Sequence, residues 1–449
     1  MCEQRTLCKA ALSLAAAVLV SAACVALLGA CIPTKAFAAT SDSQIMAGTA
    51  IQTQASQIRQ TDVSSARSGC VLLGVDGTFD SAGKSAVLNR INAIRQEACS
   101  KGVPDPRDES RKLTLSDYVP IKWSSDLEVI AQTRAAEGSI CEDHARPNET
   151  VWSDAHANGN VRTSGENLAW NNSGMMDGID QWYEEMSDWV NQNAYAVTGH
   201  YTSLINPNHT YVALGEFTPD GGGWTCVAGE FLNELYYGGS FPIDETEVGV
   251  KGAYRQVVEV ASNSVSGLVV SGQAKLKGVA TKTYSASVLA KLTSVFGGTK
   301  DVNLSPLDVI SWSSSAPSVV SVDSAGKATS KSCGTARLVA QAGGMSAAKT
   351  VKVVPKGTKL KKVSPKKKAL KVTWAKQSSL TQGFEVRCST KKSMKGAKTI
   401  KVNGASKTSC KIKKLKPKKK YYVQVRAFAK VGGEFYYSDW SSKKAKKTK

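Results

Sequence analysis

Histidine is scarce in this sequence, and several common catalytic motifs are missing. The chain has 449 residues but four histidines, all between residues 144 and 209. The motifs HExxH, GxSxG and CxxC do not occur. Their absence excludes a zincin helix, a serine nucleophile elbow and a zinc knuckle. Any imidazole chemistry must therefore come from one stretch of 66 residues.

Acidic residues are nearly absent from the last part of the chain. Residues 356–449 contain 30 lysines and arginines and three acids, a net charge of +27, so the rest of the chain carries −6 of the total +21. A solvated face that maintains solubility is one explanation of this excess. Attraction to an anionic surface is the other, and we expect any electrostatic function to belong to this segment.

Long apolar runs are also lacking, except at the start of the chain. Residues 1–38 combine a basic beginning, an apolar stretch and small residues before a cleavage point after Ala38, as in a signal peptide. The segment ending at Cys31 resembles a lipoprotein cleavage site, which leaves lipidation as an alternative. No later segment is apolar enough to span a bilayer. We therefore expect a secreted, extracellular protein with no transmembrane anchor after signal removal.

Seven of the eleven cysteines lie beyond the signal region, in a chain that we expect to meet an oxidising environment. Their pairing cannot be read from spacing alone. Cys141 and Cys226 either pair or remain buried thiols, and Cys388 and Cys410 are expected to staple neighbouring strands. The other three are Cys70, Cys99 and Cys333.

The polarity pattern divides the chain into modules. Residues 39–84 lack sustained periodicity and are predicted to be a flexible spacer. Helical periodicity over 85–98, 124–138 and 177–192, followed by a hairpin whose strands are joined by PDGGG, predicts a mixed helix and sheet domain over 85–235. A capping box of Ser125 and Glu128 is expected at the second helix. A connector is expected over 236–261. Alternating strands over 262–355 and 356–449 then predict two all-β sandwiches.

The third predicted helix distinguishes two adjacent glutamates. Its apolar stripe runs through Ile179, Trp182 and Trp189, and successive side chains turn by about 100°. Glu184 then lies almost opposite the stripe and should be solvated. Glu185 lies at the edge of the stripe, where it can meet other polar groups.

Three segments together carry a family resemblance. SGENLAW, WYEE and GHYTSLIN resemble the CAP superfamily of cysteine-rich secretory, antigen 5 and pathogenesis-related-1 proteins, also called SCP domains. HARPNETVW is similar to the HxRP element of the bacterial branch. The resemblance covers about residues 85–235 and implies an α-β-α sandwich with a central cleft. The family's usual CNY signature is missing, and Ser203 stands where a glutamine is usual, which argues against sterol carriage.

The resemblance also implies a set of site residues. The family's cleft tetrad corresponds to His144, Glu166, Glu185 and His200, and the two histidines bind divalent ions such as zinc in several members. A metal is therefore an expected cofactor, with His144 and His200 as its ligands. His156 matches no motif of the family, nor does His209, and both are expected at the surface.

Two further resemblances describe the C-terminal modules. The run VISWSSSAPSVVSVDSAGK resembles the bacterial immunoglobulin-like group 2 domain, with Trp312 expected in the core and Asp323 and Gly326 in a hairpin turn. Residues 356–449 resemble fibronectin type III. Trp374 is expected in its core, and Tyr421 is expected to form a tyrosine corner.

Three functions remain open. The first is a bacterial binding protein that holds a lipid, peptide or metal in the His/Glu cleft and is kept near the cell envelope by its β-sandwiches. The second is a metal-dependent hydrolase, a peptidase or nuclease, that uses the same residues. The third is an adhesin that binds an anionic cell-wall polymer through residues 356–449, without specific nucleic-acid recognition. Binding is favoured because the sequence shows no activated nucleophile.

Overall fold

A computed structural model describes residues 57–59, 61–157, 161–234, 250–294 and 298–449. The expected signal peptide, Cys31 and the first part of the expected spacer lie outside the described residues. The described chain divides into two compact units, one of residues up to Gly267 with Val288–Val309, the other of Leu268–Ser287 with Ile310–Lys449. None of the helices in the described ranges has the length and apolarity needed to cross a membrane.

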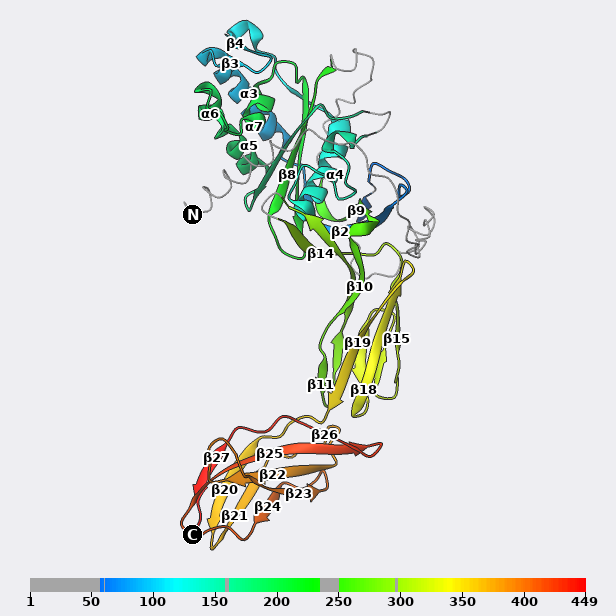
Figure 1. The fold of residues 1–449 in the computed structure, drawn as a ribbon, viewed down its shortest axis with the longest axis vertical. Coiled ribbons are helices and arrows are strands. Elements are labelled where there is room, and N and C mark those ends of the chain that lie inside the picture. Colours follow the sequence, from blue (N-terminus) through cyan, green and yellow to red (C-terminus); the bar gives the residue numbers. More distant parts are fainter. Residues whose placement is uncertain (1–56, 60, 158–160, 235–249, 295–297) are drawn as a thin grey trace, which may run out of the picture. The chain divides into compact units, whose positions relative to one another are not determined.

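The first unit is built around one seven-stranded sheet (Figure 1). Its strand order is β1-β9-β2-β7-β8-β6, and β5 pairs with β7. The strands are β1 (Gln57–Arg59), β2 (Cys70–Asp80), β5 (Lys122–Trp123), β6 (Gly165–Asn171), β7 (Tyr211–Pro219), β8 (Thr225–Leu232) and β9 (Lys251–Ala261). A small hairpin joins β3 (Pro104–Asp105) and β4 (Asp108–Lys112).

Helices cover both faces of this sheet. These helices are α3 (Lys84–Lys101), α4 (Ser125–Cys141), α5 (Met175–Tyr183), α6 (Met186–Val190) and α7 (Gly199–Ile205). Figure 1 shows α4 on one side of the sheet and α3, α5 and α7 on the other. This is the predicted α-β-α sandwich, and the predicted hairpin of β7 and β8 is confirmed.

Glycines on the sheet allow each layer to approach closely. A Cβ at Gly215 would lie 2.6 Å from the Phe79 ring and 3.5 Å from the backbone of Ala131 in α4. A Cβ at Gly229 would lie 2.9 Å from the Trp182 ring of α5. Since neighbouring layers interlock at these positions, a larger side chain would separate helix from sheet.

Two details of the helices differ from the sequence prediction. Ser124, not Ser125, caps α4, because its side chain accepts a hydrogen bond from Leu127 N. Glu128 does not complete a capping box, since its carboxylate is buried and accepts from Trp123 Nε1 at 3.0 Å. The third predicted helix is two helices, α5 and α6, that meet at Glu184 and Glu185. Glu184 is exposed and Glu185 half-buried, as the helical geometry predicted.

The predictions of a flexible spacer over residues 39–84 and a connector over 236–261 are partly wrong. Residues 70–80 form β2 and residues 251–261 form β9, and the two strands pair antiparallel over their whole length, from Cys70 with Ala261 to Asp80 with Lys251. The buried residues of β2 are Leu73, Gly74, Val75, Gly77 and Phe79. Two segments that look irregular in isolation therefore complete the sheet together. Residues 236–249 of the connector lie outside the described residues.

The predicted module over 262–355 is divided between the units. Residues 288–309 belong to the first unit and contain most of β13 (Ser285–Thr293) and all of β14 (Thr299–Leu304). Gly74 and Ser305 exchange two backbone hydrogen bonds of 2.8 Å, and Lys300 Nζ lies 2.5 Å from Glu142. These contacts attach the segment to the CAP-like unit, and composition does not reveal them.

The second unit contains the remaining β-rich modules. Its first strands are β11 (Lys275–Lys277), β12 (Thr281–Thr283), β15 (Ser311–Ser314), β16 (Val320–Val322), β17 (Lys327–Ser330), β18 (Gly334–Ala342) and β19 (Met345–Val354), preceded by β10 (Val265–Ser271). The predicted turn at Asp323 is confirmed, because its carboxylate accepts from Lys327 N and Gly326 has a φ of 72°. Trp312 is half-buried rather than fully buried, and it packs over Gly326.

The final module has two sheets around one core. The strands are β20 (Leu360–Lys366), β21 (Ala369–Trp374), β22 (Gly383–Ser389), β23 (Lys398–Asn403), β24 (Ser409–Ile412), β25 (Lys420–Val431), β26 (Glu434–Tyr437) and β27 (Lys444–Lys447). Trp374 is buried in the core. Lys416 N donates to the Tyr421 hydroxyl at 3.0 Å, so the predicted tyrosine corner is confirmed.

The cysteines of the described residues are free thiols. Cys141 and Cys226 are buried and unpaired, the second of the two expected alternatives. Cys388 on β22 and Cys410 on β24 are unpaired, although both side chains pack in the core of the final module.

A substitution in β2 tests its role in the sheet. Phe79 is 1% exposed and packs against Tyr254 of β9. We expect Phe79→Ala to lower the free energy of unfolding by about 3–5 kcal/mol, since it leaves a cavity between sheet and α4. Urea denaturation measures this, with the exposed neighbour Thr78→Ala as control. Equal stability of the two variants would show that this segment is a spacer after all.

Candidate functional site

Four side chains that are distant in sequence meet beside the edge strand β6. His144 follows α4, Glu166 lies on β6, Glu185 lies between α5 and α6, and His200 lies in α7. His144 Nδ1 is 2.7 Å from Glu166 Oε1, and His200 Nδ1 is 2.6 Å from Glu185 Oε1. The two imidazole rings stack with centroids 6.1 Å apart and planes 21° apart. The structure thus brings all four predicted residues together, as two His–Glu pairs.

Adjacent residues of β6 connect the two helical layers. Successive side chains of a strand point to opposite faces. Glu166 contacts Arg134 of α4, whereas the Asn167 amide donates to the His200 carbonyl oxygen of α7 at 2.9 Å. Because β6 is an edge strand, residues from both layers can meet beyond it.

The glutamates fix the tautomer of both histidines. A carboxylate only accepts hydrogen bonds, so each Nδ1 donates its proton to a glutamate, and the Nε2 atom of each ring takes no part in these contacts. The side chains of His144 and His200 are 41% and 24% exposed. Trp182 stacks on the His200 ring with centroids 6.5 Å apart, which restricts the position of that ring.

A buried arginine holds the first pair. Arg134 Nε lies 2.5 Å from Glu166 Oε2, and its Nη2 donates to the His144 carbonyl oxygen at 2.9 Å. Burial would raise the pKa of Glu166, but the charge of Arg134 and hydrogen bonds from Arg134 and His144 outweigh it and lower that pKa. Glu166 therefore remains ionised and can orient His144.

The second pair is held by a helix end. Glu185 Oε2 accepts hydrogen bonds from His200 N at 3.0 Å and Tyr201 N at 3.1 Å, at the start of α7. The free backbone N–H groups of a helix start favour a carboxylate. One carboxyl group thus binds both the backbone and the ring of His200.

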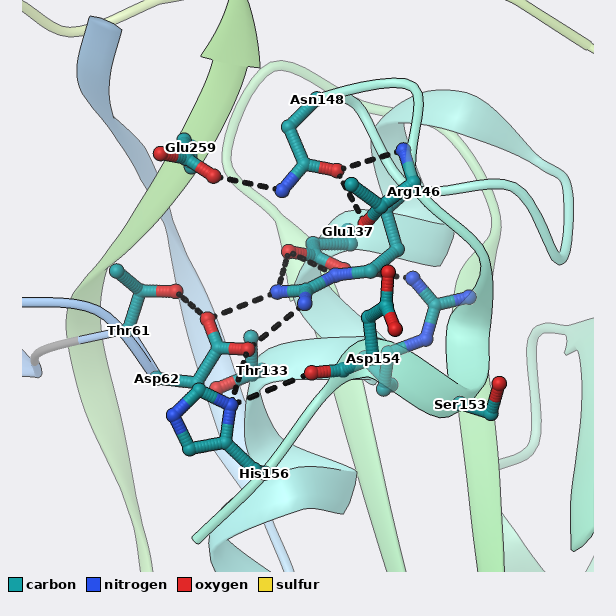
Figure 2. A network of polar contacts seen from close by, with 12 residues as sticks. Thr61, Asp62, Thr133, Glu137, Arg146, Asn148, Ser153, Asp154, His156 and Glu259 are labelled. Carbon is teal, nitrogen blue, oxygen red and sulfur yellow. Dashed lines mark hydrogen bonds and ion pairs between the residues drawn. The ribbon is translucent and has the colours of Figure 1, made fainter. Parts of the chain in front are cut away.

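The charges continue from Arg134 into a buried network (Figure 2). Glu137 accepts from Arg134 at 2.6 Å and from Arg146 at 2.8 Å, and Arg146 also donates to Asp62 at 2.7 Å. Figure 2 shows the Arg146 guanidinium between Glu137 and Asp62, with His156 beside Asp62. The HARP segment thus places its histidine in the tetrad and its arginine in the network that supports it.

Glu230 is an unpartnered carboxyl group beneath the tetrad. It lies directly opposite Glu166 on β8, it is fully buried, and neither of its oxygens has a hydrogen-bond partner among the described residues. Burial and the negative charge of Glu166 raise its pKa well above the usual range. Both effects favour the protonated form of Glu230.

The other two histidines lie outside the tetrad. His209 was expected at the surface, but it is 7% exposed, stacks on Phe231 and hydrogen-bonds the Ser203 carbonyl oxygen at 2.9 Å. Burial lowers its pKa to about 4, so it is neutral at pH 7. His156 is half-buried, with its Nδ1 3.5 Å from Asp62 Oδ2.

The tetrad offers a metal two imidazole nitrogens. In the part of the chain that the structure describes, no group of three or more His, Cys, Asp or Glu side chains is arranged to hold a metal ion. Glu166 and Glu185 engage the Nδ1 atoms and so act as orienting groups rather than direct ligands. A metal at Nε2 of both histidines would need further ligands from water or from a bound molecule.

An activated nucleophile is not seen beside the imidazoles. In the described ranges, neither ring is hydrogen-bonded to a serine, threonine or cysteine side chain. Cys141 is the last residue of α4, three residues before His144, but burial raises the pKa of its thiol to about 12, so it is protonated. The prediction that Cys141 is structural agrees with this environment.

Sequence reasoning missed the residues under the tetrad. Arg134 follows Leu127 and Ile130 at helical spacing, and a charged residue on such an apolar face is a signal of a buried partner. Glu230 lies on a strand of otherwise apolar or small residues, which is the same kind of signal. The network to Asp62 gave no such signal, since residue 62 was expected in a spacer.

Comparisons with known proteins agree with this architecture. Residues 88–228 match the family model of the cysteine-rich secretory protein family, CAP, and residues 354–444 match that of the fibronectin type III domain. Similar solved structures include one titled "Myokine structure" (21% identity, TM-score 0.17, covering 20% of this chain and 96% of that one). Another is the fn3 domain of human contactin 1 (15% identity, TM-score 0.18, covering 21% of this chain and 77% of that one). No curated protein matches the chain.

The protonation of Glu230 leads to a pH-dependent prediction. A carboxyl group with a raised folded-state pKa contributes stability below its unfolded pKa of about 4.3 and loses it as the pH rises toward the folded pKa. We expect Glu230→Gln to become more stable than the wild type over this range, with a gap growing by up to about 1.4 kcal/mol per pH unit. Urea denaturation of both proteins between pH 4 and 8 measures this difference in the free energy of unfolding.

Glu137→Gln is the matched control. Glu137 is also fully buried, but it lies between Arg134 and Arg146. Removing one partner of a buried ion pair should cost about 3–5 kcal/mol at pH 7. If Glu230→Gln lost as much stability as Glu137→Gln at pH 8, Glu230 would be an ionised, paired group.

Proposed function

We propose that this chain, with its CAP domain at residues 88–228 and its fibronectin type III domain at 354–444, is a secreted binding protein whose ligand is held at the histidine tetrad. The observation that carries the proposal is the pair of His–Glu contacts, which leave both Nε2 atoms available. Such a pair suits binding of a cation or of a hydrogen-bond donor. The absence of an activated nucleophile among the described residues favours binding over turnover.

The ligand class that two imidazole nitrogens favour is a divalent metal such as zinc. His144 and His200 would hold it, and Glu166 and Glu185 would orient the rings without touching it. The remaining positions would be filled by water or by oxygen atoms of a lipid or peptide. Metal affinity should then depend on that second molecule.

The C-terminal modules support a place outside the cell. Two β-sandwiches follow the CAP domain, and we propose that the first is an immunoglobulin-like group 2 module of bacterial type. They would space the tetrad from a cell envelope on which the protein is retained. The signal peptide over residues 1–38 belongs to the same proposal.

A metal-dependent hydrolase is the second candidate. It is favoured by the two imidazoles with adjacent carboxylates, an arrangement that suits general acid–base work at Nε2. Glu185 also binds the start of α7, so its substitution should affect the position of His200 as well as its basicity.

Zinc binding tests the leading proposal. We expect isothermal titration of the full chain with zinc to show binding that is lost in His144→Ala/His200→Ala, because both imidazole ligands are gone. His156→Ala removes a half-buried histidine outside the tetrad and should bind zinc as the wild type does. Equal zinc uptake by the double variant and the wild type would refute the metal site.

Turnover separates the two candidates. A binding protein should leave a peptide library and a mixed oligonucleotide library intact with zinc present. Cleavage that disappears in Glu185→Gln, in a preparation that still binds zinc, would establish the hydrolase instead. Mass spectrometry of the incubated libraries measures both outcomes.

A further inference from the structure

Three lysine-rich segments lie side by side at one end of the fibronectin type III domain. Backbone hydrogen bonds join Leu415 N to the Lys368 carbonyl oxygen at 3.0 Å and Lys449 N to that of Lys366 at 3.1 Å. Thr448 N donates to the Lys419 carbonyl oxygen at 3.0 Å. The turn after β20, the loop after β24 and the last strand therefore form one surface. We call this surface, residues 366–368, 413–420 and 444–449, the lysine pole.

The charge of the lysine pole has no internal compensation. The pole contains thirteen lysines, all exposed, with no arginine and no acid. The three acids of residues 356–449 lie elsewhere. Glu385 of β22 pairs with Arg426 of β25, Asp439 pairs with Lys275 and Lys277, and Glu434 lies on β26.

Like charges face each other directly across strands. Lys420 of β25 is opposite Lys447 of β27 within the lysine pole. Beside the pole, Lys371 of β21 is opposite Lys411 of β24. Directly opposed like charges destabilise a sheet, whereas solubility requires only scattered charge. The domain keeps one such pair in each of its two sheets, an arrangement that favours an external anion.

Backbone conformation gives an independent indication. Lys368, Lys414 and Lys418 have φ values of 50°, 59° and 53°, in the left-handed region where glycine and asparagine are usual. Lysine at these positions is unfavourable for the fold. The domain therefore retains lysine at three turn positions where a neutral residue would be more stable.

We propose that the lysine pole binds a linear phosphodiester polymer without bases, such as a polyol phosphate. Ammonium groups on flexible stems recognise charge rather than the geometry of a single phosphate, for which arginine is better suited. The pole itself contains no aromatic residue, and Tyr422 beside it on β25 is half-buried, with the Lys420 ammonium 5.5 Å from its ring centroid. Base stacking uses exposed aromatic faces. Lys444 and Lys446 are separated by about 7 Å along β27, and Lys420 lies about 5 Å across from Lys447, so a flexible chain of closely spaced charges can contact several lysines.

The experiment uses variants that separate binding from folding. In the full chain, Lys368→Asn/Lys414→Asn/Lys418→Asn removes three charges and replaces strained lysines with a residue that tolerates left-handed φ. This variant should have a higher melting temperature than the wild type. Its affinity for purified polyglycerol phosphate at 50 mM salt should fall at least about tenfold, and the slope of log K against log salt should decrease by about two.

The matched control is Lys391→Asn/Lys392→Asn/Lys395→Asn, which removes three exposed charges from the same domain outside the lysine pole. It should change the affinity less than about twofold. Equal weakening of both variants would overturn the pole, since net charge alone would then explain binding. Tighter binding of single-stranded DNA, hyaluronan or phosphatidylglycerol vesicles than of polyglycerol phosphate would overturn the choice of partner. His144→Ala/His200→Ala should bind the polymer normally, because the pole acts independently of the proposed tetrad function.

Discussion

The tetrad depends on one buried charge, the guanidinium group of Arg134. Arg134 is 0% exposed, and its guanidinium contacts Glu166, Glu137 and the His144 carbonyl oxygen. A buried guanidinium without partners would cost many kcal/mol, so these acceptors must be in place whenever the domain is folded. The position of His144 is therefore set by the requirement to satisfy an arginine, and the site is organised before any ligand arrives. Arg146 extends the same requirement to Asp62, at the other end of the network.

The tetrad could be predicted because its residues lie in segments with strong local patterns. Glu185 was distinguished from Glu184 by helical geometry, and His144, Glu166 and His200 lie in motifs shared with a family. Glu230 and Arg146 act through contacts made only in the folded domain, and single residues in strands and loops give little information about such contacts. His209 was misplaced for the same reason, because its burial comes from a loop that folds back over Phe231.

The fold could be predicted where a segment's own periodicity matched its environment. Helix α3 has one buried and one exposed side, helix α4 begins at a capping serine, and the β7–β8 hairpin has a clear turn. Strands β2 and β9 lack such a local pattern. They are neighbours in the middle of a sheet, and each becomes a strand by pairing with the other. The segment over residues 39–84 is rich in small polar residues at its start, and this composition obscured the strand at its end. The same limit applied to residues 288–309, which pack on the CAP unit through a few specific contacts.

The pairing of β2 with β9 affects how the domain is made. Its two strands are separated by about 170 residues, and every residue from Cys70 to Asp80 is matched with one between Lys251 and Ala261. Until the ribosome has synthesised β9, strand β2 has no neighbouring strand on one of its edges. Contacts at such long separation close slowly, because the loop entropy must be lost before they form. During synthesis β2 therefore keeps an unpaired edge until β9 has been made and this long loop has closed.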